Sequence, residues 1–377
     1  MHKGENMGSL RRLGTVLGAA SLVLGLVTIS VAATTSVATA AGAFKACVVT
    51  DTGGINDHSF NASAWLGMQN AAKSNSSITP SYLSSTSSSD YTPNINTFIS
   101  EKCGIIVTVG FLMADATQAA AKAHPSQKFA IVDYPNNVSP FGTAGASNVD
   151  GLTYETNQDA FLGGYLAAAE STTHVVATYG GEDFSTVTIY MDGFVAGVRY
   201  YNKMHKAAVK VLGWTPTAGN RATGNFNGKG TFVGSFTNAT LAESITTGDF
   251  AAGADVVFPV AGGDGLGSVS AAEKAGTGHW IEWVDTNGCT NDASACKWFL
   301  ASVTKGVTTS VMNAVLSAAN GTFTAGDYVG NLRNGGAAFI INSPTVTASL
   351  KGTIAMLTTG IEDGTISVNP NSYAATY

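Results

Sequence analysis

Charged side chains are scarce in this sequence. Asp, Glu, Lys and Arg make up 12% of its 377 residues, about half the usual ~25%. Hydrophobic residues make up 45%, so a disordered chain and an extended charged coil are both excluded. The formal net charge is −6, which makes the chain a poor binder of nucleic acid or of an anionic membrane surface. We therefore expect no nucleic-acid partner.

Long apolar runs are absent as well, except near the N-terminus. Lys3, Arg11 and Arg12 precede an uncharged stretch that ends in the small residues 37–41. This order is typical of a secretory signal, so we predict a signal peptide over residues 1–40 and an exported protein, periplasmic or associated with the cell surface. The stretch is also long enough to stay as a membrane anchor, and the paired arginines leave twin-arginine export open. No cysteine stands at the cleavage site, so a lipid anchor is not expected.

The chain has only four cysteines, Cys47, Cys103, Cys289 and Cys296. An even number in an exported chain favours two disulfides, and four cysteines allow three connectivities. Cys289 and Cys296 flank a short polar loop and would form a local pair. No C-x-x-C occurs and the histidines are scattered, so no metal site is predicted.

Common catalytic motifs are missing. The sequence contains no G-x-S-x-G, no H-E-x-x-H and no EF-hand loop. Residues 262–267 are glycine-rich and follow an apolar run, but they lack the Lys-Ser/Thr ending of a phosphate loop. We therefore predict no enzymatic activity and no cofactor. A hydrolase that uses Asp51 and Asp285 as a carboxylate pair is the less favoured alternative.

Short apolar runs alternate with Ala-rich amphipathic stretches along most of the chain. This alternation predicts an α/β fold with parallel sheets covered on both faces, and the number of elements fits two similar lobes. The expected strands are 44–51, 78–83, 104–110, 128–133, 148–155, 175–179, 208–213, 256–260 and 280–285. The alternation fails near the end, where 298–316 is predicted as one long helix and 328–333 and 337–341 as edge strands.

The strand order of such a sheet predicts the second disulfide. The first and third strands of a doubly wound sheet are neighbours. Cys47 lies at the start of the first expected strand and Cys103 just before the third. We therefore expect Cys47 to pair with Cys103, at the edge of the sheet opposite the carboxyl ends.

Acidic residues follow several of the expected strands. Asp51, Asp133 and Asp285 each end a strand, and Asp264 follows another after Gly262 and Gly263. In open α/β sheets, ligands bind beyond the carboxyl ends of the strands. A single acid at such a point is most simply a helix cap, but three at equivalent positions indicate a ligand site.

The stretch Val49-Thr-Asp-Thr-Gly-Gly-Ile-Asn-Asp-His-Ser-Phe-Asn61, with Trp65 and Gly67 after it, is the most specific part of the sequence. It resembles the opening signature of the basic-membrane-protein family of substrate-binding lipoproteins, the purine-nucleoside-receptor group. Weaker matches follow in order over nearly all of residues 44–377, among them 160–168, 190–197, 256–265, 281–285 and 330–336. The lipobox of that family is missing here.

The resemblance implies the type I periplasmic-binding-protein fold: two Rossmann-like lobes with parallel sheets, joined by three crossovers, with the ligand in the cleft between them. On this basis we expect residues 41–157 and 286–325 in the first lobe, and 158–285 and 326–377 in the second. The crossovers are expected at 156–158, 286–288 and 322–328. Hinge closure around the ligand is expected with them.

The resemblance also implies delivery of nucleosides to the permease subunits of an ABC importer by a monomeric binding protein. By position, the nucleoside contacts of the family fall on Asp51, Phe60, Asp133, Phe236, Gly262, Gly263, Asp285 and Lys305, with Asn56 and Asn61 as additions. The choice between Phe232 and Phe236 as the second stacking ring stays open, with Phe236 favoured.

These residue types suit a nucleoside, which is neutral and combines a flat aromatic base with a hydroxylated sugar. Aromatic rings can sandwich the base, and carboxylates accept hydrogen bonds from sugar hydroxyls or base N–H groups. Lys305 would donate to a ribose oxygen and offset the carboxylates. A binding protein for another small ligand, such as a sugar, is the alternative. Two simpler interpretations also remain: Phe60 as a core residue of its helix, and Lys305 as a solvated helix residue.

Overall fold

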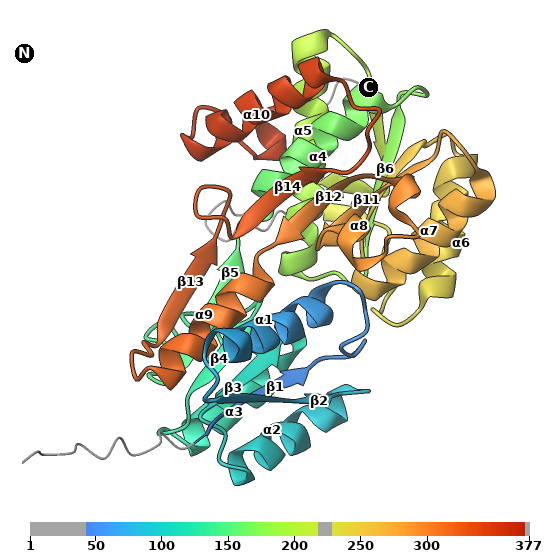
Figure 1. Cartoon of the computed structure of the whole chain (residues 1–377). Helices are drawn as coiled ribbons and strands as arrows, with labels where there is room; N and C mark the ends of the chain where they lie inside the picture. Colours follow the sequence, from blue (N-terminus) through green and yellow to red (C-terminus); the bar gives the residue numbers. More distant parts are fainter. Residues whose placement is uncertain (1–42, 218–227, 374–377) are drawn as a thin grey trace, which may run out of the picture. The chain divides into compact units, whose positions relative to one another are not determined.

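A computed structural model describes residues 43–217 and 228–373, and it contains two six-stranded sheets (Figure 1). The predicted signal peptide lies outside the described residues. The first sheet is parallel throughout. Its strands, in spatial order, are β13 (Gly326–Gly330), β5 (Val149–Tyr154), β4 (Phe129–Val132), β3 (Ile105–Val109), β1 (Phe44–Thr50) and β2 (Ile78–Ser84).

The second sheet repeats this arrangement with one antiparallel edge strand, β14. Its strands, in spatial order, are β14 (Ala337–Ile341), β12 (Phe299–Lys305), β11 (Trp280–Asp285), β10 (Val256–Val260), β6 (Val175–Gly180) and β7 (Lys210–Leu212). A separate antiparallel pair joins β8 (Trp214–Pro216) to β9 (Gly228–Gly230). The central strands are buried along their whole length, which is why they consist of continuous apolar, largely β-branched residues.

Helices cover both faces of each sheet. On the first sheet, α1 (Phe60–Ser74) and α9 (Val307–Ala319) pack side by side on one face, and α2 (Tyr91–Ser100) and α3 (Ala114–Ala123) pack on the other (Figure 1). On the second, α4 (Asn157–Glu170), α5 (Ser185–His205) and α10 (Ala348–Glu362) oppose α6 (Ala239–Ala251) and α7 (Gly265–Ala275). A short helix, α8 (Gly288–Asn291), precedes β12. Among the described residues, no helix is both long and apolar enough to cross a membrane.

Both predicted disulfides are present. Cys47 of β1 bonds to Cys103, which precedes β3, with the Cα atoms 6.0 Å apart. The pairing of β1 with β3 brings the two residues to the same sheet edge. Cys289 bonds to Cys296 across the short loop, with a Cα–Cα separation of 4.5 Å.

The segment 298–316 was expected to be one long helix, and the structure corrects this. It contains strand β12 followed by helix α9. Periodicity cannot separate a seven-residue apolar run from a buried helix segment, so the strand was missed. The expected lobe division differs at the same place: β12 lies in the second sheet, and β13 in the first.

The chain passes between the sheets three times within the described residues. The first passage follows β5 and leads into α4, close to the expected 156–158. The second lies at Gly306, between β12 and α9, and the third lies at 331–336, between β13 and β14. The expected crossovers at 286–288 and 322–328 are therefore wrong, because each of those segments connects elements of one lobe.

Candidate functional site

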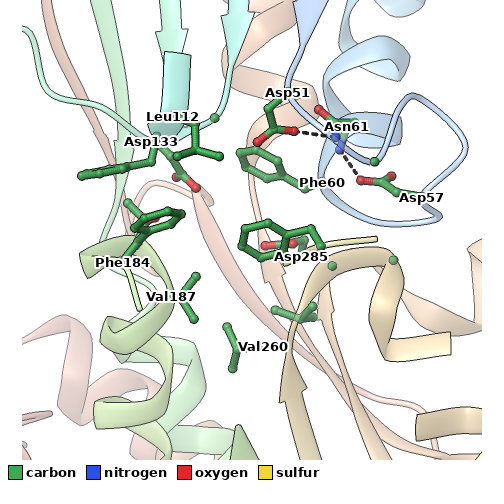
Figure 2. A pocket seen from close by; sticks show the side chains of 18 of the residues that line it. Asp51, Asp57, Phe60, Asn61, Leu112, Asp133, Phe184, Val187, Val260 and Asp285 are labelled. Carbon is green, nitrogen blue, oxygen red and sulfur yellow. Dashed lines mark hydrogen bonds between the residues drawn. The ribbon is translucent and has the colours of Figure 1, made fainter. Parts of the chain in front are cut away.

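The carboxyl ends of the two sheets face each other across a cavity (Figure 2). Both sheets supply its walls, as the position of ligands in open α/β folds requires. The predicted residues that line it are Asp51, Phe60, Asn61, Asp133, Phe236, Gly262, Gly263, Asp285 and Lys305. Asn56 is the one predicted residue that does not; the neighbouring Asp57 does.

Asp57 fixes the start of α1. Its carboxylate accepts hydrogen bonds from the backbone N–H groups of Ser59, Asn61 and Ala62, at 2.8 to 3.0 Å. A carboxylate in this position satisfies the free N–H groups of a helix start and suits its positive dipole. Asp57 therefore orients the first turn of α1, which carries Phe60 and Asn61 into the cavity (Figure 2).

Asp51 and Asn61 form a buried polar pair at the edge of the cavity. The Asn61 Nδ2 group donates to Asp51 Oδ1 at 2.9 Å, while Asn61 Oδ1 is buried without a protein partner. Burial raises the pKa of Asp51 to about 8, against the lowering effect of the Asn61 hydrogen bond. At neutral pH the Asp51 carboxyl is therefore largely protonated and can both donate and accept a hydrogen bond.

Lys305 supplies the positive charge of the cavity floor. Its Nζ atom lies 2.7 Å from Asp133 Oδ2 and 3.7 Å from Asp285 Oδ1. Burial disfavours the ammonium group, but the two carboxylates outweigh this effect and raise the pKa of Lys305. The side chain is buried at the end of β12, so it is not the solvated helix residue considered above.

The Asp285 carboxylate is bonded on both oxygens. Tyr190 Oη donates to Oδ1 at 2.9 Å, and Ser59 Oγ donates to Oδ2 at 3.0 Å. Asp133 and Asp285 both have a φ of 65°, an uncommon conformation for a residue with a side chain. The same backbone turn thus aims the strand-end carboxylate of each sheet toward Lys305.

Aromatic rings form much of the cavity wall. Phe60 comes from α1, and its ring also lies 4.9 Å from Lys305 Nζ. Phe236 packs against Gly181, where a Cβ atom would lie 2.2 Å from the ring. Phe232 instead packs edge-on against Trp214, with ring centroids 6.0 Å apart, and it does not line the cavity. The geometry favours Phe236 over Phe232 as a stacking ring.

A second aromatic pair spans the two lobes and was not predicted. Phe111 follows β3 of the first sheet, and Phe184 precedes α5 of the second. Their rings stack with centroids 5.0 Å apart and planes at 22°. Figure 2 shows Phe184 across the cavity from Phe60, with Val187 and Val260 below it. Both phenylalanines stand in short connections, where hydrophobic periodicity gives no signal.

Within residues 43–217 and 228–373, no group of three or more His, Cys, Asp or Glu side chains could hold a metal ion. The cavity has a polar floor where Lys305 lies between two carboxylates, a carboxyl–amide pair at one side, and aromatic walls. A site of this composition is suited to a small, largely uncharged molecule with a flat apolar face and several hydrogen-bonding groups.

The amino-acid sequence matches a family of substrate-binding proteins over most of its length. Residues 44–223 and 229–350 match the family described as Bmp, ABC transporter substrate-binding protein PnrA-like. The chain is 30% identical over 340 residues to the ABC transporter nucleoside-binding protein BmpA of Lactococcus lactis, covering 86% of this chain and 88% of that protein.

Two solved structures share the fold. An ABC transporter solute-binding protein from Aeropyrum pernix superposes with a TM-score of 0.72 at 21% identity, covering 86% of this chain and 92% of that one. A solute-binding protein from Actinobacillus succinogenes with bound D-allose gives a TM-score of 0.58 at 14% identity, covering 79% and 98%. With its two facing sheets and its match to the family over most of its length, the chain belongs to the PnrA-like substrate-binding proteins of ABC transporters.

Proposed function

We propose that this protein works outside the cytoplasm, where it captures a nucleoside in the cavity between its lobes and delivers it to an ABC importer. Purine nucleosides are the preferred ligands in this proposal. The observation that carries the proposal is the placement of Phe60 and Phe236 on the wall of a cavity whose floor holds Lys305 between two carboxylates. The nucleoside-binding relative from Lactococcus lactis supports the ligand class.

The base would lie between the rings of Phe60 and Phe236. Stacking of this kind contributes about 1–3 kcal/mol per ring and accepts any base. Asp51 and Asn61 stand beside Phe60 and would contact the polar edge of the base. A protonated Asp51 offers a donor and an acceptor side by side, which suits the adjacent carbonyl and N–H groups of hypoxanthine or guanine.

The ribose would lie over the floor of the cavity. Sugar hydroxyls can donate to the carboxylates of Asp133 and Asp285 and accept from Lys305. Because Tyr190 and Ser59 already orient Asp285, little ordering cost remains when the ligand binds. One cation faces two carboxylates here, so phosphorylated ligands are disfavoured.

A sugar-binding protein is the second candidate, because the fold is shared with the D-allose complex. Fold likeness alone does not decide the ligand. Calorimetry with inosine, guanosine, adenosine, cytidine and D-allose separates the two. We expect the purine nucleosides to bind most tightly, and Phe60→Ala or Phe236→Ala to weaken them about 5- to 150-fold. Preference of the parent protein for D-allose would overturn the proposal.

Incubation of the protein with inosine tests whether it is an enzyme. We propose a binding protein and not an enzyme, so inosine recovered after prolonged incubation should be chemically unchanged. Release of hypoxanthine would instead favour the hydrolase alternative, with Asp51 and Asp285 as the residues to mutate first.

A further inference from the structure

The loop before α1 is held to the second lobe by contacts that lie outside the cavity. The main-chain carbonyl of His58 accepts hydrogen bonds from Asn291 Nδ2 at 2.8 Å and from Thr286 Oγ1 at 3.1 Å. The His58 ring Nδ1 lies 3.1 Å from the carbonyl oxygen of Asn291. Neither Thr286 nor Asn291 lines the cavity. These contacts join the lobes without touching the ligand space.

The two donors are themselves fixed in place. Asn291 Nδ2 also donates to Thr286 Oγ1 at 2.9 Å, and Trp283 Nε1 donates to the same hydroxyl at 3.0 Å. Asn291 lies within the loop that the Cys289–Cys296 disulfide closes. A short closed loop has few conformations to lose, so the disulfide keeps Asn291 in position.

His58 lies just before the residues at the start of α1 that line the cavity. Ser59, which bonds to Asp285, and the cavity residues Phe60 and Asn61 follow His58 directly. His58 has a φ of 55°, uncommon for a residue with a side chain. The bonds that hold its peptide group therefore also set the direction from which α1 presents Phe60 and Asn61.

We propose that Asn291, together with Thr286, is a positioning residue for ligand retention: it latches the His58 loop of the first lobe to the disulfide-closed loop of the second. The functional readout of this inference rests on the proposed nucleoside binding. Because the latch bonds join the two lobes, moving the His58 loop away from the second lobe would break them. They bias the equilibrium toward the closed state and slow ligand release.

The test uses Asn291→Ala, with two readouts. Stopped-flow release of inosine should be about 3- to 10-fold faster, the effect of losing one or two hydrogen bonds, with the association rate nearly unchanged. Spin labels at Asn96→Cys on α2 and Thr247→Cys on α6 report the interlobe distance without ligand, and the described residues contain no free cysteine to interfere. Their distance distribution should shift to longer values.

Three further variants make the result specific. Thr286→Ser keeps the hydroxyl and should behave like the parent, and Asn320→Ala, at the end of α9 away from the latch, is the matched control. The Cys289→Ser/Cys296→Ser pair should change release in the same direction as Asn291→Ala.

Unchanged release and unchanged label distances in Asn291→Ala would overturn the latch. If the parent fails to bind inosine, the proposed function fails, while the distances in the unliganded protein still decide whether the latch exists. A longer distance with unchanged release would also contradict the inference, because the latch would then hold the lobes without retaining ligand.

Discussion

Glu282 of β11 offers a quantitative test of how the second lobe is built. Its side chain is fully buried, and neither carboxyl oxygen has a hydrogen-bond partner in the described structure. It faces α4 at Gly163, where a Cβ atom would lie 2.5 Å from Oε2. Burial raises the pKa of Glu282 from 4.5 to about 8. The folded protein therefore keeps this carboxyl neutral at pH 7.

The sign of the pH dependence follows from proton counting. Between the pKa of the unfolded chain and that of the folded protein, the folded state binds one proton more at this site. The free energy of unfolding then falls as pH rises, by up to about 1.4 kcal/mol per pH unit. With a folded pKa of about 8, the contribution of Glu282 should decrease by about 3 kcal/mol from pH 5 to pH 8.

Glu282→Gln should remove this component, because the amide does not titrate. Urea unfolding at pH 5 and pH 8 measures the free energy of unfolding of the parent and the variant. The loss of stability over this range should be about 3 kcal/mol smaller in Glu282→Gln. Comparing the two pH values cancels any constant cost of the amide. Glu101→Gln, at a partly exposed ion pair with Lys45, is the control and should follow the parent. Identical pH dependence in Glu282→Gln and the parent would refute the reasoning.

Three further predictions concern the cavity and its closure. Gly181→Ala should displace the Phe236 ring and weaken nucleoside binding as much as Phe236→Ala does. The control Gly248→Ala, with open space around the added methyl group, should bind normally. Equal calorimetric affinities of the two glycine variants would contradict the packing of Phe236 against Gly181. Lys305→Met leaves two buried carboxylates without their cation and should lower the free energy of unfolding by about 3–5 kcal/mol. The loss should be smaller at pH 5 than at pH 8, because protonation of a carboxylate relieves the charge repulsion. A loss in urea unfolding that does not change with pH would count against the ion pair. Nucleoside should reduce the radius of gyration in small-angle scattering, and an identical profile at saturating ligand would argue against hinge closure.

The strand-end aspartates were predictable because their signal is local. Each follows a continuous apolar run, and the topology of parallel sheets brings such ends together. Asp51, Asp133 and Asp285 accordingly all line the cavity. The disulfide between Cys47 and Cys103 followed from the same strand order.

The connections between the lobes were harder to predict. Because the sequence pattern did not separate β12 from the helix that follows it, Lys305 was not recognised as a residue at a strand end. For the same reason the second crossover was predicted at 286–288 instead of at Gly306. The structure places Lys305 closer to Asp133 than to Asp285, a preference that depends on how the two sheets face each other. Phe111 and Phe184 depend on the same packing, so no local pattern could have paired them.

The central claim is that the cavity selects a purine nucleoside, and one retention experiment tests it directly. The protein, stripped of ligand by unfolding and refolding, is mixed with equal amounts of inosine, guanosine, adenosine, cytidine, D-allose and free hypoxanthine. Unbound compounds are removed by gel filtration, and mass spectrometry identifies what the protein releases on denaturation. The account predicts a purine nucleoside at close to one molecule per chain. Retention of D-allose, or of none of these compounds, would contradict it.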